Sequence, residues 1–461
     1  MEQYAVKNIV LNQEGWGRKW RERLPVIIDK RTGVPLVDPL RFTLKHLRSS
    51  VAVNTVEQIC SVLQLFYCWL ESKTPQLTAE LAAAGIPTEP PPGTHQVEYC
   101  LTQRIKTRGI ILEPQDIDRL AYLYRLRASD FEIACQPSVA RNKRTPDKVV
   151  SMEKARQSAR PKSKMLSQVS PDYIGIRLNY TKKYVEYLAM EYSGRLSLPV
   201  AIRESLQRTA AINCTTLGAL TPRLKQDDKA PEGLSDEEWE ALESVVHPDS
   251  PENPWGSTFV RKRNYLVICA LRALGVRGGE LLKLKTRELN KAHQYLSVTK
   301  TPDDHEDLRT YQPQAKTLAR DLPLAPQLLN DLDNYIREVR GAIPAAKRKH
   351  PFVFTTEDGS PMAEHTLGNI FRDIRKKHPH LPARLTAHKL RYTHSDKLWE
   401  HIEQTNKTDE QKMDMLRRHN GWSANSVMPM KYAMRAISDK VNQISVDAQM
   451  RLFKSKPTEQ K

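Results

Sequence analysis

Cysteines are few and scattered in this chain, which argues against the frameworks that depend on them. The 461 residues contain six cysteines, with no Cys-x-x-Cys pair and no histidine paired with them. Disulfide-stapled domains and zinc sites both need clustered or closely spaced cysteines. We therefore expect reduced thiols packed in the cores of a cytoplasmic protein. They are Cys60, Cys68, Cys100, Cys135, Cys214 and Cys269.

Long apolar runs and a secretory leader are also missing. The first residues, MEQYAVKNIV, lack the charged-then-apolar layout of a signal peptide. The longest apolar run, near YLVICALRALGV, is interrupted by Arg272 and is too short to span a bilayer. No glycine-rich phosphate loop of the GxxxxGKS/T kind occurs, so nothing indicates nucleotide-driven chemistry. We expect a cytoplasmic protein without a membrane partner.

Acidic residues are outnumbered. The chain has 72 Lys and Arg against 54 Asp and Glu, which gives a formal charge of +18 and a pI of about 9.5. Such a balance favours a polyanionic partner, and nucleic acid is the commonest one for a basic chain. The alternative is a basic protein whose Lys and Arg faces are only solvated, and charge alone does not choose between the two.

The first half of the chain has helical periodicity. Within residues 54–72, apolar side chains recur at helical spacing and form a wide stripe, with Asn54 or Thr55 as the expected N-cap. Other helical patterns lie near 96–104, near 114–127 and from Ser170-Pro171, a cap followed by proline at the first helical position. We expect an all-helical domain over 36–215. The preceding residues 1–35 show no convincing period, and the sequence gives them no role.

One stretch of this region has too little apolar surface to join a core. Residues 141–164 hold nine Lys or Arg against two acidic residues, with almost no large apolar side chain. Such a composition cannot bury enough surface to order itself. We expect a flexible basic insert over 130–168, either a solvated linker or a segment that follows DNA phosphates.

A second domain is expected over 234–445, after a linker at 216–233 and before a tail at 446–461. It opens with a capping box, in which Ser235 is the N-cap and Glu238 the third helical residue. The other expected elements are the helix 260–274, a polar helix after Gly279, the strand 295–299, a long polar loop, a short strand at 322–324, the helix 326–340, a strand and turn over 352–362, and the last helices.

Two stretches of this domain carry side chains suited to phosphate. In AHKLRYTH, His388 and Arg391 are three residues apart and so share one helix face. In ALGVRGGELLKL, Gly275 can supply a turn with positive φ, and Arg277 follows it at a helix start. Glu280, one turn further on, could brace that guanidinium. A planar arginine fork beside backbone donors suits a bound phosphate, although each stretch alone also fits an ordinary surface.

Together with GWS…KYA, where Tyr432 follows Trp422 by ten residues, these stretches resemble the tyrosine recombinase (phage integrase) family. The family pattern is a Gly-x-Arg-x-x-Glu-Leu box, a His-x-x-Arg box, a Gly-His/Trp pair and a Tyr near the C-terminus. The resemblance covers roughly residues 232–445, and the region before it resembles the family's core-binding domain in layout. The fold class implied is mainly α, with a small antiparallel β-sheet in a C-terminal catalytic domain (α+β) that an all-helical core-binding domain precedes.

The resemblance implies a role for each matching residue. Arg277 and Arg391 would hold the non-bridging oxygens of a scissile phosphate and neutralise the charge of the transition state. Tyr432 would attack this phosphate, leaving a 3′-phosphotyrosine and a free 5′-hydroxyl. His388 would act as the base. Trp422 would support the transition state by packing and by an indole N–H bond.

Some assignments within this set stay open. The family also uses a lysine on a β-hairpin loop to protonate the leaving oxygen, and Lys316, which starts KTLARDLPL, is favoured over Lys300. Either lysine could instead be a solvated loop residue. His419 could take the place of Trp422, and the interval from Trp422 to Tyr432 is one residue longer than the family's usual spacing.

The function implied is that of a site-specific DNA recombinase or integrase of a mobile element. Its partners would be double-stranded DNA and three further copies, in a homotetramer on two DNA sites, with room for accessory DNA-bending or directionality factors. No cofactor is expected: the arginines replace a metal ion, and the phosphotyrosyl bond retains the energy for rejoining. The alternatives are a type IB topoisomerase-like activity and a catalytically silent DNA-binding regulator.

Overall fold

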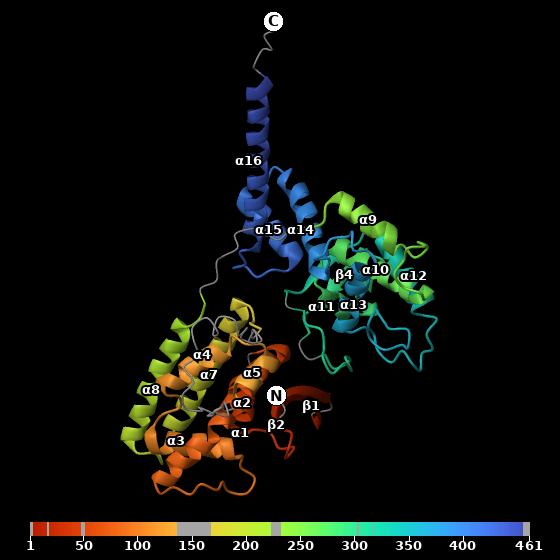
Figure 1. The fold of residues 1–461 in the computed structure, drawn as a ribbon. Coiled ribbons are helices and arrows are strands. Elements are labelled where there is room, and N and C mark those ends of the chain that lie inside the picture. Colours follow the sequence, from red (N-terminus) through yellow and green to blue (C-terminus); the bar gives the residue numbers. More distant parts are fainter. Residues whose placement is uncertain are drawn as a thin grey trace, which may run out of the picture. The chain divides into compact units, whose positions relative to one another are not determined.

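The computed structural model describes residues 3–15, 18–47, 51–135, 167–222, 232–301, 304–315 and 317–454. The chain divides into two compact units, Met1–Lys225 and Gln226–Lys461 (Figure 1). Each unit has its own apolar core. None of the helices that the structure describes is long and apolar enough to cross a membrane.

A β-hairpin opens the first unit. Strands β1 (Tyr4–Gly15) and β2 (Arg18–Asp29) pair antiparallel, with Tyr4 opposite Asp29. The Tyr4 hydroxyl donates to Glu71 at 2.9 Å, which fastens the hairpin to helix α2 (Val53–Ala83). The hairpin has no convincing period in the sequence because residues 23–29 of β2 are buried without a break, so the usual alternation of a strand is lost.

Helices form the rest of the first unit. They are α1 (Val37–Phe42), the π-turn η1 (Thr43–Leu47), α2, α3 (Gln96–Arg108), α4 (Pro114–Leu123), α5 (Ala128–Cys135), α7 (Pro171–Ser193) and α8 (Val200–Ala219). The prediction of Asn54 or Thr55 as N-cap is wrong, because α2 begins one residue before Asn54 and its N-cap is Ala52. The Ser170 cap is confirmed, since its side chain accepts from the amide of Tyr173.

The predicted insert begins later than residue 130. Residues 130–135 belong to α5, where Phe131 is fully buried and lies 6.2 Å from the ring of Tyr124. At the other end, the amide of Ser167 donates to Asp130 at 2.7 Å. The aromatic contact of Phe131 holds this end of the segment in the core. The basic stretch 141–164 itself lies outside the described residues.

The second unit is mainly helical around one small sheet, as predicted. Its elements are α9 (Asp236–Val246), α10 (Thr258–Leu274), α11 (Gly278–Lys283), the 3-10 turn η2 (Thr286–Glu288), β3 (Leu289–Asn290), β4 (Tyr295–Val298), β5 (Arg320–Pro323), α12 (Pro326–Asn334), the π-turn η3 (Tyr335–Val339), α13 (Glu364–Lys377), α14 (Ala387–Glu403), α15 (Asp409–Asn420) and α16 (Met428–Lys454). The strands pair antiparallel in the order β3-β4-β5. The capping box of Ser235 and Glu238 is confirmed.

The segment 352–362 differs from its prediction. It forms isolated bridges, from Phe352 to Lys285 and from Thr355 to Pro361, instead of a strand of the sheet. The amide of Val353 donates to the carbonyl of Leu284 at 2.8 Å. The segment is therefore hydrogen-bonded to the connection after α11. Backbone groups that pair there do not pair with the strands β3, β4 and β5. The expected turn follows at Gly359, whose φ is 89°.

The apolar residues of the second unit form two clusters. The larger one surrounds α10, whose Val267, Ile268 and Leu271 are fully buried. The smaller one lies under the start of α16; it consists of Trp399, Ile402, Leu416, Trp422 and Tyr432. Two of the residues singled out in the sequence thus belong to a packed aromatic cluster.

Candidate active site

One buried carboxylate holds three arginines together in the second unit. Glu280, on α11, is 1% exposed. Arg320 lies 3.0 Å and Arg391 3.9 Å from its Oε2, and Arg277 lies 3.5 Å from its Oε1. The hydroxyl of Thr317 also donates to Glu280. Burial alone would raise the pKa of Glu280, but Arg320, Thr317 and Arg391 together lower it below its usual range. Three positive charges against one negative charge leave this site electropositive.

Arg277 occupies the position that the sequence predicts. Gly275 ends α10 with a φ of 60°, and a Cβ there would come within 2.3 Å of the His394 ring. Arg277 then caps α11, and its amide donates to Glu280 at 3.0 Å. The Nη1 atom of Arg277 is buried and has no hydrogen-bond partner among the described residues. Burial also lowers the pKa of Arg277. This guanidinium is therefore a donor that a bound anion could satisfy.

Arg391 is buried more deeply, on α14. Its side chain is 3% exposed and donates to the carbonyl of Gly275 and, at 2.8 Å, to that of Asn420. The guanidinium also lies over the Trp422 ring, 5.7 Å from its centroid. Burial and then the charge of Arg277 lower the pKa of Arg391 to about 9. It stays protonated at neutral pH, and two arginines forced this close favour an anion between them.

His388 lies on the same helix, one turn before Arg391. Its side chain is exposed, and its ring lies 6.0 Å from that of Tyr392. The prediction that His388 and Arg391 share a helix is confirmed. The histidine thus stands at the solvent side of a helix whose next turn reaches the buried arginine cluster.

Trp422 and Tyr432 stack on one another. Their ring centroids are 5.8 Å apart and the rings lie 22° from parallel. Tyr432 is 1% exposed, and its hydroxyl is buried. Burial raises the pKa of Tyr432 to about 12. In this arrangement the phenol is held neutral, although a tyrosine nucleophile reacts as the phenolate.

Arg320 connects the sheet to the segment that precedes Trp422, and the sequence analysis missed it. Its Nε donates to the carbonyl of His419 at 2.7 Å, and its Nη1 to Thr317 at 2.8 Å. A Cβ at Gly421, which has a φ of 64°, would lie 2.7 Å from this Nη1. The sequence contains one feature that could have indicated this position. In a strand, residues two apart share a face, so Arg320 lies on the same face of β5 as the buried Leu322.

The His419 ring is engaged elsewhere. Its Nε2 lies 2.8 Å from Nε2 of His394, and the two rings stack at 4.9 Å. The other His394 nitrogen, Nδ1, lies 3.0 Å from the carbonyl of Arg272. Burial, helped by neighbouring charges, lowers the pKa of both histidines to about 4. The structure brings Trp422 against Tyr432 and Arg391. The choice between Trp422 and His419 stays a prediction.

The two candidate lysines belong to the connection between β4 and β5. Lys316 lies outside the described residues. Lys300 is exposed just after β4, where it lines an open cleft together with Lys285, Arg287 and Tyr295. The choice between Lys316 and Lys300 stays a prediction.

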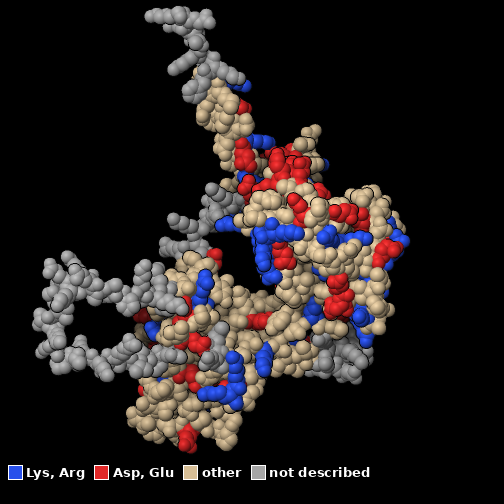
Figure 2. Space-filling model, turned by 45° about the vertical axis from the view of Figure 1, so that its right-hand side comes forward, with Lys and Arg blue, Asp and Glu red and all other residues tan. Residues whose placement is uncertain are grey.

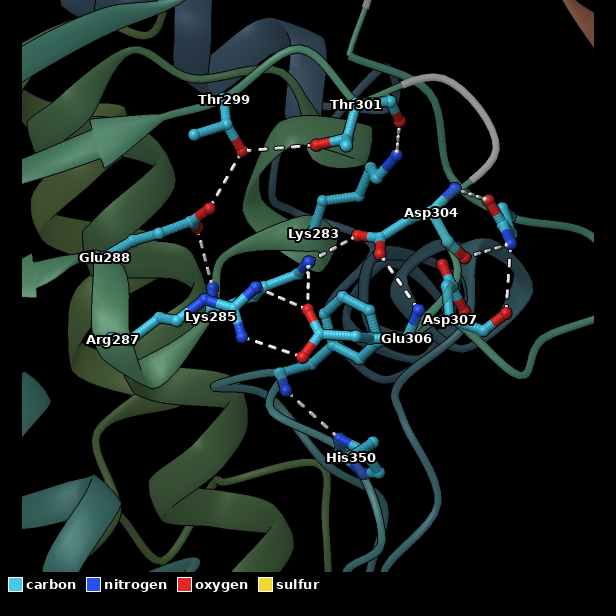
Figure 3. Close-up of polar contacts among 12 residues, drawn as sticks. Lys283, Lys285, Arg287, Glu288, Thr299, Thr301, Asp304, Glu306, Asp307 and His350 are labelled. Atoms are coloured by element: carbon cyan, nitrogen blue, oxygen red, sulfur yellow. Dashed lines mark hydrogen bonds and ion pairs between the residues drawn. The ribbon is translucent and has the colours of Figure 1, made fainter. Parts of the chain in front are cut away.

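A partly buried ionic network fastens this connection to the domain (Figure 3). Lys285 points between two carboxylates, with its Nζ 2.7 Å from Asp304 and 2.7 Å from Glu306. The amide of Asp304 donates to the Gln312 side chain at 3.0 Å, which in turn donates to the carbonyl of Asp307 at 3.0 Å. The stretch that the sequence predicts as a long polar loop is thus folded around its own charged side chains.

The same connection lies directly against the candidate site. Arg309 stacks 4.6 Å over Phe352 and donates to the carbonyl of Leu282, in α11, at 3.3 Å. A Cβ at Gly279 would come within 2.5 Å of the carbonyl of Gln314, so glycine is needed for this approach. These contacts position the end of the connection, so that the hydroxyl of Thr317 reaches the carboxylate of Glu280.

Comparison with known families identifies this region. A model described as "Phage integrase family" matches residues 253–411. The chain contains a phage integrase family domain. The matched range includes Arg277, His388 and Arg391 and ends before Trp422 and Tyr432. This integrase domain is the mainly helical C-terminal unit with the small antiparallel sheet, and a largely helical region precedes it.

Solved structures of recombinases show a distant likeness. The XerA recombinase is 17% identical, with 57% of this chain and 82% of that chain covered and a TM-score of 0.33. The Tn1549 transposon integrase, in complex with a circular intermediate DNA, is 19% identical over 57% and 85% of the two chains, with a TM-score of 0.37. The XerH recombinase, bound to a palindromic difH substrate, is 16% identical over 60% and 77%, also with a TM-score of 0.37. A comparison with curated proteins gives no match.

Proposed function

We propose that this chain is a site-specific DNA recombinase that cleaves and rejoins strands through Tyr432. The observation that carries the proposal is the electropositive site around Glu280. Three guanidiniums meet there, and the buried Nη1 of Arg277 makes no hydrogen bond to the described residues, although it lies 3.5 Å from Oε1 of Glu280. Trp422 links this site to Tyr432, because it contacts the guanidinium of Arg391 and the ring of Tyr432.

A DNA phosphate would complete this arrangement. Its non-bridging oxygens would accept from Arg277 and Arg391, which offset the charge that grows in the transition state. The Tyr432 oxygen attacks phosphorus while the bond to the 5′-oxygen breaks. His388 takes the phenol proton, and the lysine, Lys316 by preference, gives one to the leaving 5′-oxygen. A 3′-phosphotyrosine and a free 5′-hydroxyl result, and reversal with another 5′-hydroxyl rejoins the strands.

Cleavage by this route requires a rearrangement of Tyr432. Its hydroxyl is buried and its pKa is raised to about 12, so phenolate is scarce at neutral pH. The charge of Arg391 already lowers the pKa of Tyr432, and burial outweighs it. Moving the hydroxyl closer to Arg391 and toward Arg277 would lower the pKa of the phenol further. We infer that bound DNA brings the N-terminal turn of α16 into this position. Cleavage is then confined to the DNA complex.

The biological role that we propose is the integration or excision of a mobile element by four copies on two DNA sites. One observation favours a second candidate, a catalytically silent DNA-binding protein: the family match ends before Tyr432, whose hydroxyl is buried. A topoisomerase-like activity would use the same chemistry without a defined site.

One capture experiment separates these functions. The protein is incubated with a library of nicked DNA duplexes, covalent complexes are isolated under denaturing conditions, and the attached 3′ ends are sequenced. We expect ends that map to one sequence, and no complex from Tyr432→Phe. Tyr265→Phe, the same exchange at a half-buried tyrosine of α10 that contacts none of the described site residues, is the matched control and should retain the complex. Ends without a common sequence would indicate a topoisomerase, and no covalent complex from the wild type would indicate the silent protein.

A further inference from the structure

Two histidines on different helices form a hydrogen-bonded pair beside the arginine cluster. His394, on α14, and His419, near the end of α15, approach to 2.8 Å between their Nε2 atoms, and both side chains are half-buried. The Nδ1 atom of His394 lies 3.0 Å from the carbonyl oxygen of Arg272, on α10. The pair therefore joins three helices, and neither ring takes part in the chemical steps proposed above.

The neighbours of the pair determine where its protons lie. A carbonyl only accepts, so Nδ1 of a neutral His394 carries the proton and its Nε2 is left as an acceptor. Nε2 of His419 must then be the donor between the two rings. A second proton on His394 would set two N–H groups against one another, and a second proton on His419 would add a positive charge near Arg320 and Arg391. The geometry is therefore that of two neutral rings.

The surrounding charges favour the same neutral state. The visible face of the second unit carries charged side chains of both signs (Figure 2), but the side chains that act on the pair are cations. Burial, to which Arg320 and Arg391 add, lowers the pKa of both histidines to about 4. At neutral pH the hydrogen bond between the rings therefore has a single proton arrangement.

The pair lies between the two turns that hold Arg391. A Cβ at Gly275 would come within 2.3 Å of the His394 ring, so this ring packs directly against the turn after α10. The carbonyl of Gly275 accepts from Nη1 of Arg391. The residue after His419 is Asn420, whose carbonyl accepts from Nη2 of Arg391 at 2.8 Å. The two rings thus connect the two carbonyls that fix this guanidinium.

The end of α15 also holds a second guanidinium of the site. Nε of Arg320 donates to the carbonyl of His419 at 2.7 Å. The amide of Leu318 donates to the carbonyl of Gly421 at 2.9 Å. Three consecutive carbonyls, those of residues 419–421, therefore accept hydrogen bonds from groups of the site or its approach. A shift of this helix end would move both arginines together.

We propose that the hydrogen bond between His394 and His419 is a positioning device that holds Arg320 and Arg391 in place for the phosphate. Misplacing a reacting group by about 1 Å can cost roughly 100-fold in rate, so a pair that never touches DNA can still control the rate of cleavage. The effect on rate rests on the proposed function, whereas the effect on the helix end does not.

Substitutions that match the ring atoms separate the hydrogen bond from packing. His419→Leu removes the donor, whereas His419→Gln places an amide N–H where Nε2 carried one. His394→Phe removes the acceptor on the other side. His401→Leu, at an exposed histidine of α14, is the matched control. For each variant the rate of covalent complex formation is measured at saturating concentrations of a nicked duplex that carries the captured sequence, together with DNA affinity and Tm.

We expect His419→Leu and His394→Phe each to form the complex about 10- to 100-fold more slowly, with DNA affinity unchanged within about threefold. The double variant should be no slower than either single variant, because both remove the same hydrogen bond. His419→Gln and His401→Leu should stay within about threefold of the wild type. A wild-type rate for His394→Phe, multiplied losses in the double variant, or a His419→Gln variant as slow as His419→Leu would overturn the proposal.

Hydrogen exchange without DNA separates a failure of this inference from a failure of the proposed function. The amide of Leu318 reports on the helix end, because it donates to the carbonyl of Gly421. Mass spectrometry should show faster exchange of this amide in His419→Leu than in the wild type or in His419→Gln. If the wild type forms no covalent complex, the proposed function fails and the exchange comparison decides alone. Equal exchange in His419→Leu and the wild type would then overturn the positioning pair.

Discussion

Replacing Glu280 by Gln should destabilise the integrase domain and make its stability depend on anions. The substitution removes the carboxylate that faces Arg277, Arg320 and Arg391. Breaking a buried ion pair typically costs about 3–5 kcal/mol. A glutamine oxygen can still accept from the Arg277 amide, so we expect a loss near the lower end, about 3 kcal/mol. For a unit of this size that corresponds to roughly 6–12 °C in Tm.

The assay is thermal unfolding in sodium chloride and in sodium sulfate at equal ionic strength. Sulfate, a phosphate-like anion, should restore part of the lost stability by binding the three unbalanced guanidiniums. Glu240→Gln, the same exchange at an exposed position of the same domain, should change Tm by less than about 2 °C, since surface substitutions stay within about 0.5 kcal/mol. An unchanged Tm of Glu280→Gln would refute the description of the site as an arginine cluster that Glu280 neutralises. A sulfate-induced rise in Tm that is no larger in Glu280→Gln than in the wild type would refute the proposal that the cluster binds an anion.

Further predictions concern the guanidinium fork, the loop network and the histidine pair. Arg277→Lys should lower covalent complex formation by about 100-fold or more while DNA binding in a filter assay changes little, because a lysine cannot reproduce the bidentate grip; near-normal complex formation would contradict this. Lys285→Met should cost about 3 kcal/mol in denaturant unfolding, because it leaves the buried Asp304 carboxylate without its partner. Lys291→Met removes an exposed lysine, 56% exposed, that pairs with the half-buried Asp333, and should cost less than about 1 kcal/mol. Equal losses would contradict the loop's anchoring. The pKa values of His394 and His419 are lowered to about 4 in the folded protein, whereas an unfolded chain has histidine pKa values near 6.5. The free energy of unfolding should therefore fall as the pH drops from about 6.5 toward 4, and His394→Gln should reduce that pH dependence. An unchanged pH dependence in this variant would contradict the role of the histidine pair.

The sequence predicted helix ends correctly where the end depends on residues that are neighbours in the chain. Ser170 and Ser235 cap helices because a side-chain oxygen next to a helix start needs no distant partner. Gly275 takes a positive φ for the same kind of reason, since the turn requires it. The hairpin of β1 and β2 escaped prediction because the continuous burial of residues 23–29 depends on packing in the first unit.

The candidate site was predictable only in part. Arg277, Glu280 and Arg391 stand in motifs whose spacing is visible in the sequence, and the structure brings all three together. Arg320 joins them through a contact between segments 40 residues apart in the chain, which no local pattern encodes. The burial of the Tyr432 hydroxyl is likewise a product of packing among α14, α15 and α16.

Identifying the residue that carries the DNA tests the central claim most directly. The covalent complex is digested with protease and nuclease, and the peptide that bears the remaining nucleotide is sequenced by mass spectrometry. We predict a nucleotide attached through its 3′-phosphate to Tyr432, and no modified peptide from Tyr432→Phe. A nucleotide on any other residue, or a modified peptide that persists in Tyr432→Phe, would contradict the assignment of Tyr432 as the nucleophile.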